Sequence, residues 1–378
     1  MKNLKFGGEA IVTGLGSLKY LDTFKNMKAF IVTGGSSMIK NGTIDRIKTI
    51  LEENGSEAYI HSGVKANPDT DDVAAGLEAI NRCKPDVLIA VGGGSAIDLG
   101  KVLSIIYENP ELDIEKMACT SLPDKRKHLK LVAIPSTSGT GTEVTSASVI
   151  TYKKRDIKIG LKSIAMIPDV AILDPEITMS MPDNVVAETG MDALTHAVEC
   201  YINNRVDDFT ACLAKGAVEG ILEFLPFSYT KKTFESREKM HNFQCMAGLA
   251  FTNTGLGMSH GIAHAVGGKF NLGHGLINAI ALPFVLEFNS RSPEVAKRLE
   301  GLSATAGKDF IIAVRELDEK LHIPKTFREA GIAEDRYFED FDALVNNSMM
   351  GSTRSNPLKI TKEEMADLLK VMFNGRSE

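Results

Sequence analysis

The chain has 378 residues, a length at which a single hydrophobic core usually gives way to two, so we expect two domains. A hydrophobic fraction of 43% and a charged fraction of 24% are ordinary for a globular protein, and a formal net charge of −6 argues against nucleic acid as a partner. No apolar run long enough to span a membrane is present, and the first residues lack the apolar core of a signal peptide, so we expect a cytoplasmic protein with no membrane partner.

The first half of the chain alternates short apolar runs with segments of helical periodicity. The predicted elements, in chain order, are a strand at 29–33, helices at 44–54 and 71–82, and strands at 87–91 and 129–134. Strands that alternate with helices of this length are typical of a parallel, doubly wound sheet. We therefore predict a Rossmann-like α/β domain over residues 1–183. Gly14-Leu-Gly16 lacks the third glycine of the dinucleotide fingerprint and is interpreted as a turn.

Beyond Pro182 the pattern changes to one helix after another, with few β-branched runs. We predict a hinge near Met181–Asn184 and an all-helical domain over residues 184–378, with the active site in the cleft between the domains. Near the end of the chain, Thr361-Lys-Glu-Glu364 has the form of a helix capping box. An apolar stripe follows it and is predicted to be core: Met365, Leu368, Leu369 and Met372.

The first candidate binding segment is Gly92-Gly-Gly-Ser95, where a predicted buried strand runs into a helix. Without side chains the backbone can approach a pyrophosphate, whose charge is met by free N–H groups and the helix dipole. Ser95 can cap this helix or donate to phosphate, and Asp98 lies in its first turn. An ordinary strand-to-helix turn is the alternative, but the position directly after a buried strand favours phosphate binding.

Two further segments follow predicted strands in the same half. Gly34-Gly35-Ser36-Ser37 lies where a nucleotide ribose would be expected, and NAD sites often place an acidic residue there. Small neutral residues leave room for a 2′-phosphate, which favours NADP over NAD. The turn from Ser136 to Thr142 includes Thr137, Ser138 and Thr140, whose hydroxyls could donate to the nicotinamide half of the cofactor. A loop that satisfies its own backbone is an equally good interpretation.

A metal site is indicated by histidines in the second half. Asp192 and His196 are four residues apart on one predicted helix face, as are His260 and His264, and His274 follows in a glycine-flanked turn. Because the five cysteines form no Cys-x-x-Cys pair, a thiolate zinc site is not indicated. A cation held by imidazoles and a carboxylate would stabilise the alkoxide that forms when an alcohol loses its proton. The simpler explanations are an intrahelical ion pair and buried, hydrogen-bonded histidines. Five candidates also exceed what a catalytic site uses, since one position must stay open for substrate.

The motifs together resemble those of the iron-containing (group III) alcohol dehydrogenases, which include lactaldehyde reductases, 1,3-propanediol dehydrogenases and butanol dehydrogenases. The similarity extends from Phe6-Gly to Asn356-Pro357. The segments that match best are Gly92–Asp98, Pro135–Glu143, Asp174-Pro, Gly190–His196 and His260–Gly275. The resemblance implies the two-domain fold of the dehydroquinate synthase type, with an α/β dinucleotide-binding domain and a helical metal-binding domain.

The resemblance also implies roles for single residues. The metal ligands would be Asp192, His196, His260 and His274. His264 would be the nonligand histidine near the nicotinamide and substrate, often assigned to proton relay. The metal would be Fe²⁺, with Zn²⁺ as a substitute, since imidazoles and a carboxylate suit either ion. Gly93, Lys158 and several neighbours match cofactor contacts of the family. The complete predicted cofactor set is Gly34, Ser36, Ser37, Gly92, Gly93, Gly94, Ser95, Asp98, Thr137, Ser138, Thr140 and Lys158.

Two positions depart from the family pattern. NAD-preferring members often have an acidic residue where this chain has Gly34, which again favours NADP. Many relatives have a cysteine four residues before the late Asn-Pro, where this chain has Ser352, with Met349 and Met350 close by. This changed lining means that the exact substrate of a relative does not carry over.

We therefore expect a homo-oligomer of two or more subunits that interconverts a small primary alcohol and an aldehyde by hydride transfer to or from NAD(P). A nonredox enzyme of the dehydroquinate synthase type would need basic residues for an acidic substrate, and Lys269 is the nearest one to the histidines. A maleylacetate reductase-like enzyme would lack the metal ligands. The presence of both sites together with His264 argues against a noncatalytic nucleotide- and metal-binding sensor.

Overall fold

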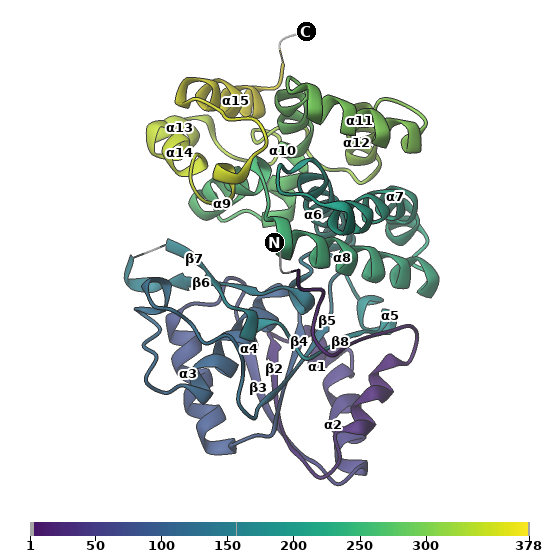
Figure 1. The fold of residues 1–378 in the computed structure, drawn as a ribbon, viewed down its shortest axis with the longest axis vertical. Coiled ribbons are helices and arrows are strands. Elements are labelled where there is room, and N and C mark those ends of the chain that lie inside the picture. Colours follow the sequence, from purple (N-terminus) through teal and green to yellow (C-terminus); the bar gives the residue numbers. More distant parts are fainter. Residues whose placement is uncertain (1–3, 156, 377–378) are drawn as a thin grey trace. The chain divides into compact units, whose positions relative to one another are not determined.

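The computed structural model describes residues 4–155 and 157–376. The chain divides into two compact units, Met1–Met181 and Pro182–Glu378, and the division falls beside the hinge predicted near Met181–Asn184. The first unit is α/β and the second is built of helices, which confirms the predicted fold class (Figure 1). Within the described residues, no helix is long and apolar enough to cross a membrane.

The first unit is organised around a six-stranded sheet whose paired strands are all parallel, in the order β1-β8-β5-β4-β2-β3. Its strands are β1 (Ala10–Thr13), β2 (Lys28–Gly34), β3 (Glu57–Val64), β4 (Val87–Gly92), β5 (Lys130–Pro135) and β8 (Val170–Leu173). The predicted strands correspond to β2, β4 and β5 within one residue at each end. A separate antiparallel pair, β6 (Ala147–Tyr152) and β7 (Ile157–Lys162), was not predicted.

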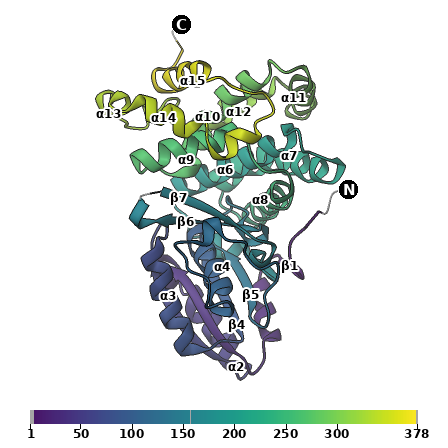
Figure 2. The same cartoon turned by 60° about the vertical axis from the view of Figure 1, so that its left-hand side comes forward.

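Helices cover both faces of this sheet (Figures 1 and 2). On one face, α3 (Thr70–Cys83) and α4 (Gly94–Glu108) pack against Phe30 and Val32 of β2. On the other, α2 (Thr43–Glu53) and η1 (Ser17–Thr23) pack against Ala29 and Ile31. Alternate residues of one strand thus serve two cores, which is why these strands are apolar throughout. The remaining short segments are α1 (Ser37–Lys40), η2 (Met117–Cys119), η3 (Thr142–Val144), η4 (Lys153–Arg155), η5 (Ile164–Met166) and α5 (Pro175–Thr178).

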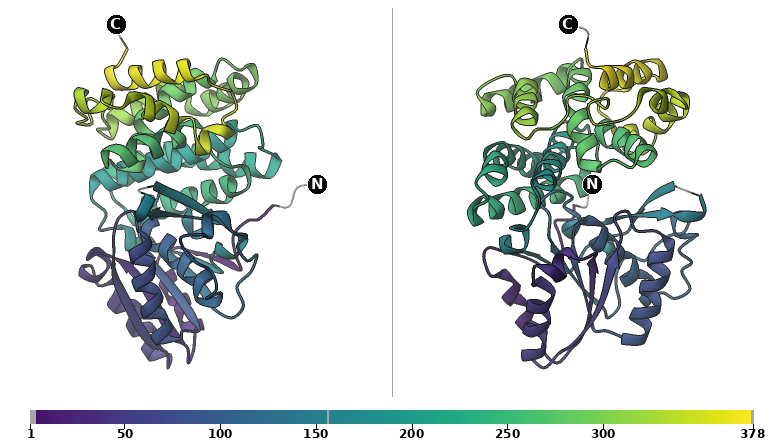
Figure 3. Two further views of the ribbon diagram at one scale, coloured as in Figure 1. Left: turned by 90° about the vertical axis from the view of Figure 1, so that its left-hand side faces the viewer. Right: turned by 180° about the vertical axis from the view of Figure 1, so that it is seen from behind.

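The second unit consists of helices, as predicted, and α6, α7 and α8 pack side by side within it (Figure 3). The longer helices are α6 (Asp183–Ile202), α7 (Asp208–Thr230), α8 (Phe234–Thr254), α9 (Met258–Phe270), α10 (His274–Asn289), α11 (Pro293–Ala306), α12 (Phe310–Lys320) and α15 (Lys362–Asn374). Between α12 and α15 lie α13 (Glu334–Phe338), α14 (Phe341–Ser348) and η6 (Gly351–Ser355). The capping box of Thr361 and Glu364 is confirmed at the start of α15, and Met365, Leu369 and Met372 are buried as predicted.

Close packing of α6, α7 and α8 fixes the helix that carries Asp192 and His196. A Cβ atom at Gly190 of α6 would lie 2.3 Å from the side chain of Leu225 in α7. One at Gly220 of α7 would lie 2.2 Å from the ring of Phe243 in α8. Only glycine permits the helices to approach this closely, so these residues are part of what places the histidines.

Candidate functional site

Three of the four predicted metal ligands meet within the second unit. Asp192 lies on α6, His260 on α9, and His274 is the first residue of α10, and one ligand atom from each falls within 4.8 Å of the others. His260 Nε2 and His274 Nε2 lie 3.8 and 3.9 Å from Asp192 Oδ1. His196 is one helical turn after Asp192, with its Nδ1 4.0 Å from Asp192 Oδ2.

The spacing of these atoms suits a shared cation. Two atoms that each lie about 2.1 Å from one ion are at most about 4.2 Å apart. The distances of His260 and His274 from Asp192 Oδ1 satisfy this limit, whereas His196 approaches the other oxygen, Oδ2. The buried Nε2 atom of His260 has no hydrogen-bond partner, although a buried polar atom normally has one. A lone pair directed at a metal ion would account for that atom. The side chain of His274 is 37% exposed, so the cluster is open on one side.

Charge and burial in the cluster favour cation binding. Burial raises the pKa of Asp192, but the neighbouring His196, His274 and His260 and a hydrogen bond from Asn278 outweigh it, so the pKa is lowered overall. Burial, with the adjacent His196 and His274, holds the pKa of His260 well below its ordinary value. At neutral pH the cluster therefore presents a carboxylate and neutral imidazole nitrogen, which are the protonation states that bind metal.

The other two histidines stack on this cluster. The ring of His196 lies between those of His260 and Phe251, with centroids 4.4 and 4.5 Å away. The ring of His264 stacks on His274 at 5.0 Å and is exposed. The structure thus brings all five candidates together, with His196 beside the compact three-residue group and His264 at its exposed edge.

Two polar residues at the cluster were missed in the sequence. Asn278, one turn after His274, donates to Asp192 Oδ1 over 2.7 Å and lies 3.2 Å from His274 Nε2. Glu199, two turns after Asp192, is 1% exposed and lies 2.7 Å from His260 Nδ1. Both positions follow a candidate ligand at helical spacing. That spacing is the signal that could have revealed them.

Steric contacts explain why glycine stands on both sides of His274. A Cβ atom at Gly273 would lie 2.5 Å from the side chain of Glu188, and one at Gly275 would lie 2.3 Å from the carbonyl oxygen of Glu188. The start of α10 therefore rests directly on α6. This contact delivers His274 to the helix that carries Asp192.

In the first unit, the predicted phosphate turn lies between β4 and α4. Gly92 has a φ of 147°, which disfavours any residue with a side chain, and Gly93 is the N-cap of α4 without a side-chain hydrogen bond to the helix. The free N–H groups of this helix start are available to an anion. The Ser/Thr turn packs on it: Ser136 N–H donates to Gly92, and a Cβ atom at Gly94 would lie 2.9 Å from Thr140.

The carboxylate of Asp98 takes part in a hydrogen-bond network that was not predicted from the sequence. Its carboxylate accepts hydrogen bonds from the Thr142 hydroxyl at 2.6 Å and from the Val149 N–H at 2.8 Å. Lys101, fully buried in α4, donates to the Thr142 hydroxyl and to Thr145 and Ala147 over 2.8–3.1 Å. Burial lowers the pKa of Lys101 to about 8, with Asp98 acting against this effect. The network shapes the Ser/Thr turn from within, and a cofactor contact for Asp98 stays a prediction.

The remaining predicted cofactor residues fall into two groups. Ser95 Oγ accepts from the Asn67 N–H at 3.2 Å, and Lys158 of β7 donates to the Asn67 side chain at 2.9 Å, so Asn67 joins the two beside the glycine turn. Gly34 ends β2, and Gly35–Ser37 are exposed. The nearest atom to a Cβ at Gly34 would be a backbone oxygen 3.8 Å away. The absence of an acidic side chain there is thus not imposed by lack of space.

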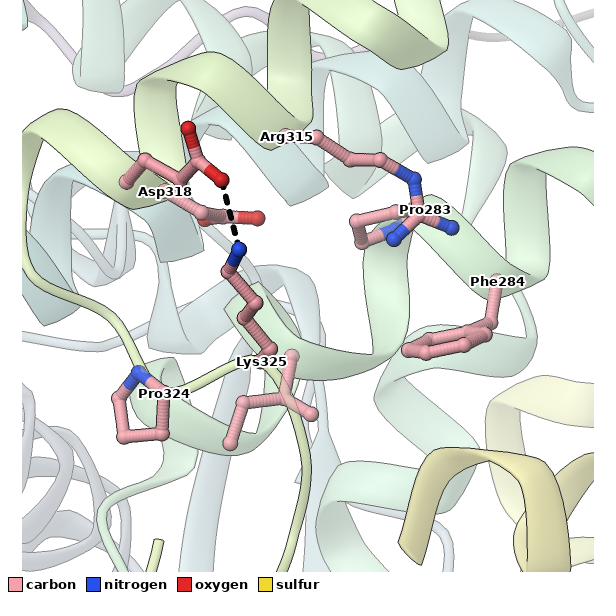
Figure 4. A pocket seen from close by; sticks show the side chains of 8 residues that line it. Pro283, Phe284, Arg315, Asp318, Pro324 and Lys325 are labelled. Atoms are coloured by element: carbon pink, nitrogen blue, oxygen red, sulfur yellow. Dashed lines mark ion pairs between the residues drawn. The ribbon is translucent and has the colours of Figure 1, made fainter. Parts of the chain in front are cut away.

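A pocket of about 90 Å³ lies elsewhere in the second unit, between α10, α12 and the segment after α12 (Figure 4). None of the predicted site residues lines it. The pocket is lined by Ile280, Pro283, Phe284, Arg315, Asp318, Glu319, Pro324 and Lys325. Lys325 Nζ is paired with Glu319 at 2.7 Å, whereas Asp318 Oδ1 has no hydrogen-bond partner. Burial raises the pKa of Asp318 well above its ordinary value.

Comparison with known proteins covers both units. Residues 8–175 match the family described as iron-containing alcohol dehydrogenase, and residues 186–373 match the C-terminal part of the same family. The NADPH-dependent butanol dehydrogenase of Clostridium saccharobutylicum is 40% identical over 97% of this chain and 96% of its own length. The aldehyde-alcohol dehydrogenase of Streptococcus pneumoniae is 36% identical over 96% of this chain but only 45% of its own length.

A solved structure agrees with these matches. The iron-containing alcohol dehydrogenase of Thermococcus thioreducens superposes with a TM-score of 0.91 and 31% identity over all of both chains. The comparisons do not favour a dehydroquinate synthase-like enzyme or a noncatalytic sensor. They support an alcohol dehydrogenase that uses NAD(P). From the matched residues and the relatives together, this chain belongs to the iron-containing alcohol dehydrogenase family.

Proposed function

We propose that this protein is an NADPH-dependent, iron-containing enzyme that reduces small aldehydes to primary alcohols and catalyses the reverse reaction. The observation that carries the proposal is the convergence of Asp192, His260 and His274 from three helices, with a buried, unpartnered nitrogen on His260. A structural cluster would satisfy that nitrogen internally.

The metal would be held by Asp192, His196, His260 and His274. A bound Fe²⁺ or Zn²⁺ supplies Lewis-acid stabilisation of negative charge on the substrate oxygen. Asn278 donates to the same oxygen of Asp192 that faces His260 and His274, and so holds this carboxylate in place. His264, exposed and stacked on His274, is placed to exchange a proton with solvent at the accessible edge of the cluster.

The preference for NADPH rests on Gly34 and the exposed Gly35–Ser37 after β2. A carboxylate here would repel a 2′-phosphate, and space for a side chain exists at Gly34 without one being present. The relative from Clostridium saccharobutylicum is named as NADPH-dependent, which agrees with this proposal. Phosphates would bind at Gly92–Ser95, with Lys158 supplying positive charge.

A small alcohol or aldehyde is proposed as substrate because relatives are named for butanol and 1-propanol. Ser352 and its neighbours lie in η6, which packs against the histidine helix α9. Met350, which immediately precedes η6, is 50% exposed and offers a flexible apolar side chain beside it.

We also propose that the enzyme is a cytoplasmic homo-oligomer that pairs through its N-terminal strand. Within the described residues, β1 is at one edge of the sheet, and its Ile11 is 39% exposed. An exposed edge strand with an apolar side chain is a ready site for pairing with another chain. Sedimentation velocity on the protein, with Ile11→Lys as the variant, tests this assembly.

The activity is tested by anaerobic assay of iron-loaded protein with NADPH and with NADH against straight-chain aldehydes of two to six carbons and a diol. We expect turnover with short aldehydes, a higher kcat/KM with NADPH than with NADH, and loss of turnover on chelation. Absence of turnover with metal supplied would refute the proposed reaction. A preference for NADH would refute only the nucleotide assignment.

A further inference from the structure

Glu199 is a buried carboxylate at the histidine cluster. Among Asp192, His260 and His274, its hydrogen-bonding contact is with His260. Glu199 lies on α6 one turn beyond His196 and is 1% exposed. Its two oxygens have three polar partners, all at the start of α9. Oε2 accepts from the N–H of Gly257 at 2.8 Å and lies 2.7 Å from His260 Nδ1, and Oε1 accepts from the N–H of Ser259 at 2.6 Å.

The start of α9 depends on these bonds because it supplies no cap of its own. The N-cap residue is Gly257, which has no side chain to accept the free N–H groups of the first turn. Glu199 takes that role from another helix, and its negative charge also meets the positive end of the α9 dipole. The Met258 N–H donates to the side chain of Asn356, so each of these N–H groups has a distant partner.

Gly257 allows this close approach. A Cβ atom there would lie 2.9 Å from Glu199 Oε1 and 3.2 Å from the Asn356 side-chain oxygen. Asn356 is in turn held by paired side-chain bonds with Asn289 of α10, at 2.7 and 3.1 Å. The position of α9 is therefore set from α6 and α10, the same helices that carry Asp192 and His274.

The bond to His260 also determines which ring nitrogen can bind a metal. An ionised Glu199 only accepts, so in that state Nδ1 carries the proton and donates it to Glu199. Nε2 is then left with its lone pair, and this is the buried atom without a partner, 3.8 Å from Asp192. Carboxylate–histidine pairs of this kind fix the tautomer and ring orientation of metal-binding histidines in many proteins.

We propose that Glu199 is a positioning residue that makes His260 a metal ligand, by holding the start of α9 and fixing the Nδ1–H tautomer of its ring. This inference rests on the proposed metal-dependent function. It predicts that loss of the carboxylate weakens metal binding itself, independently of nucleotide binding or turnover.

The test is the dissociation constant for Zn²⁺ of the full-length protein, measured by competition with a chelator of known affinity. Glu199→Gln keeps the side-chain volume but offers one accepting oxygen instead of two. We expect the constant to rise about 10–100-fold. The visible absorption bands of the Co²⁺-substituted protein should also change, which a merely structural role would not produce. Asp318→Asn, a buried carboxylate in the same unit that lines a pocket without any of these histidines, is the matched control and should bind Zn²⁺ as wild type does.

Glu199→Asp keeps the charge but withdraws it by one methylene, and we expect a smaller rise in the dissociation constant. It carries the test if Glu199→Gln does not fold, and NADPH binding serves as the check of folding for both. A folded variant with wild-type Zn²⁺ affinity and an unchanged Co²⁺ spectrum would overturn the inference alone. If the wild-type protein bound neither Zn²⁺ nor Co²⁺ at this cluster, the proposed metal-dependent function would be overturned, and the inference with it.

Discussion

The carboxyl group of Asp318 is buried in α12, 8% exposed, and its Oδ1 has no hydrogen-bond partner (Figure 4). Burial raises its pKa well above the ordinary value; Arg315 opposes this effect and Glu319 adds to it. Replacement by asparagine removes the charge at nearly constant volume. Because burying an unpaired charge costs more than burying a neutral amide, we expect Asp318→Asn to raise the free energy of unfolding at pH 7 by ~2 kcal/mol. For a unit of this size, that gain corresponds to a Tm higher by roughly 4–8 °C.

The gain should depend on pH in a defined direction. The pKa of Asp318 is raised in the folded state, so the folded protein keeps the proton at pH values where the unfolded chain has released it. Stability due to this group is therefore present below pH ~4 and is lost as pH rises towards the folded-state pKa. The advantage of Asp318→Asn should accordingly be small near pH 4 and should grow as pH rises.

Scanning calorimetry of wild type and variant across this pH range measures both effects. Glu319→Gln is the matched control, since it removes an adjacent carboxylate whose ion pair with Lys325 is largely exposed. We expect that control to change the free energy of unfolding by no more than about 1 kcal/mol. The reasoning would be refuted if Asp318→Asn left Tm unchanged or lower at pH 7, or if the difference were the same at every pH.

Three further outcomes follow from the sites. His260→Ala should abolish turnover, because it removes a proposed ligand from the centre of the cluster. NADPH binding, measured by fluorescence titration, should stay near the wild-type value. Near-normal activity after chelation would contradict the metal assignment. Gly34→Asp should raise the KM for NADPH about tenfold or more, because a carboxylate repels a 2′-phosphate, and should leave the KM for NADH little changed. Steady-state kinetics with both nucleotides measures the two KM values. An equal change in both would count against the NADPH assignment. Gly261→Ala should lower the free energy of unfolding by about 1–3 kcal/mol, because its Cβ would lie 1.9 Å from Thr353 Oγ1. Gly268→Ala on the same helix, with no atom within 4 Å of its Cβ, should be neutral or stabilising in the same denaturation assay, and similar losses in both would disprove the steric explanation.

The sequence predicted the strands at the centre of the sheet and missed those at its edges, for a physical reason. Every residue of β4 is buried, because helices cover both faces, and such a strand appears as an unbroken apolar run. The edge strands β1 and β3 keep exposed positions, and their patterns of burial are mixed. β8 is an exception, since Val170–Leu173 is apolar throughout and fully buried, and only its short length concealed it.

The candidate metal site was predictable to the extent that its members repeat at helical spacing. Asp192 with His196, and His260 with His264, share a turn on one helix, so their proximity follows from the sequence alone. Glu199 and Asn278 satisfy the same spacing but make their decisive contacts with residues 61 and 86 positions away. Lys101 likewise reaches acceptors more than 40 positions along the chain. Such partners depend on how helices and strands pack, which a local pattern does not contain.

The glycines around the histidines are sequence features that reflect packing against residues far away along the chain. Gly257 permits Glu199 and Asn356 to reach the start of α9, and Gly273 and Gly275 let α10 rest on α6. At each position a methyl group would fall within 3.0 Å of an atom of α6. Since such contacts force backbone or side chains to shift, each glycine constrains where an imidazole lies. Glycine density in this segment therefore reflects the tight helix approach that the proposed shared cation would require. Substituting one of these glycines should alter metal affinity even though no proposed ligand is changed.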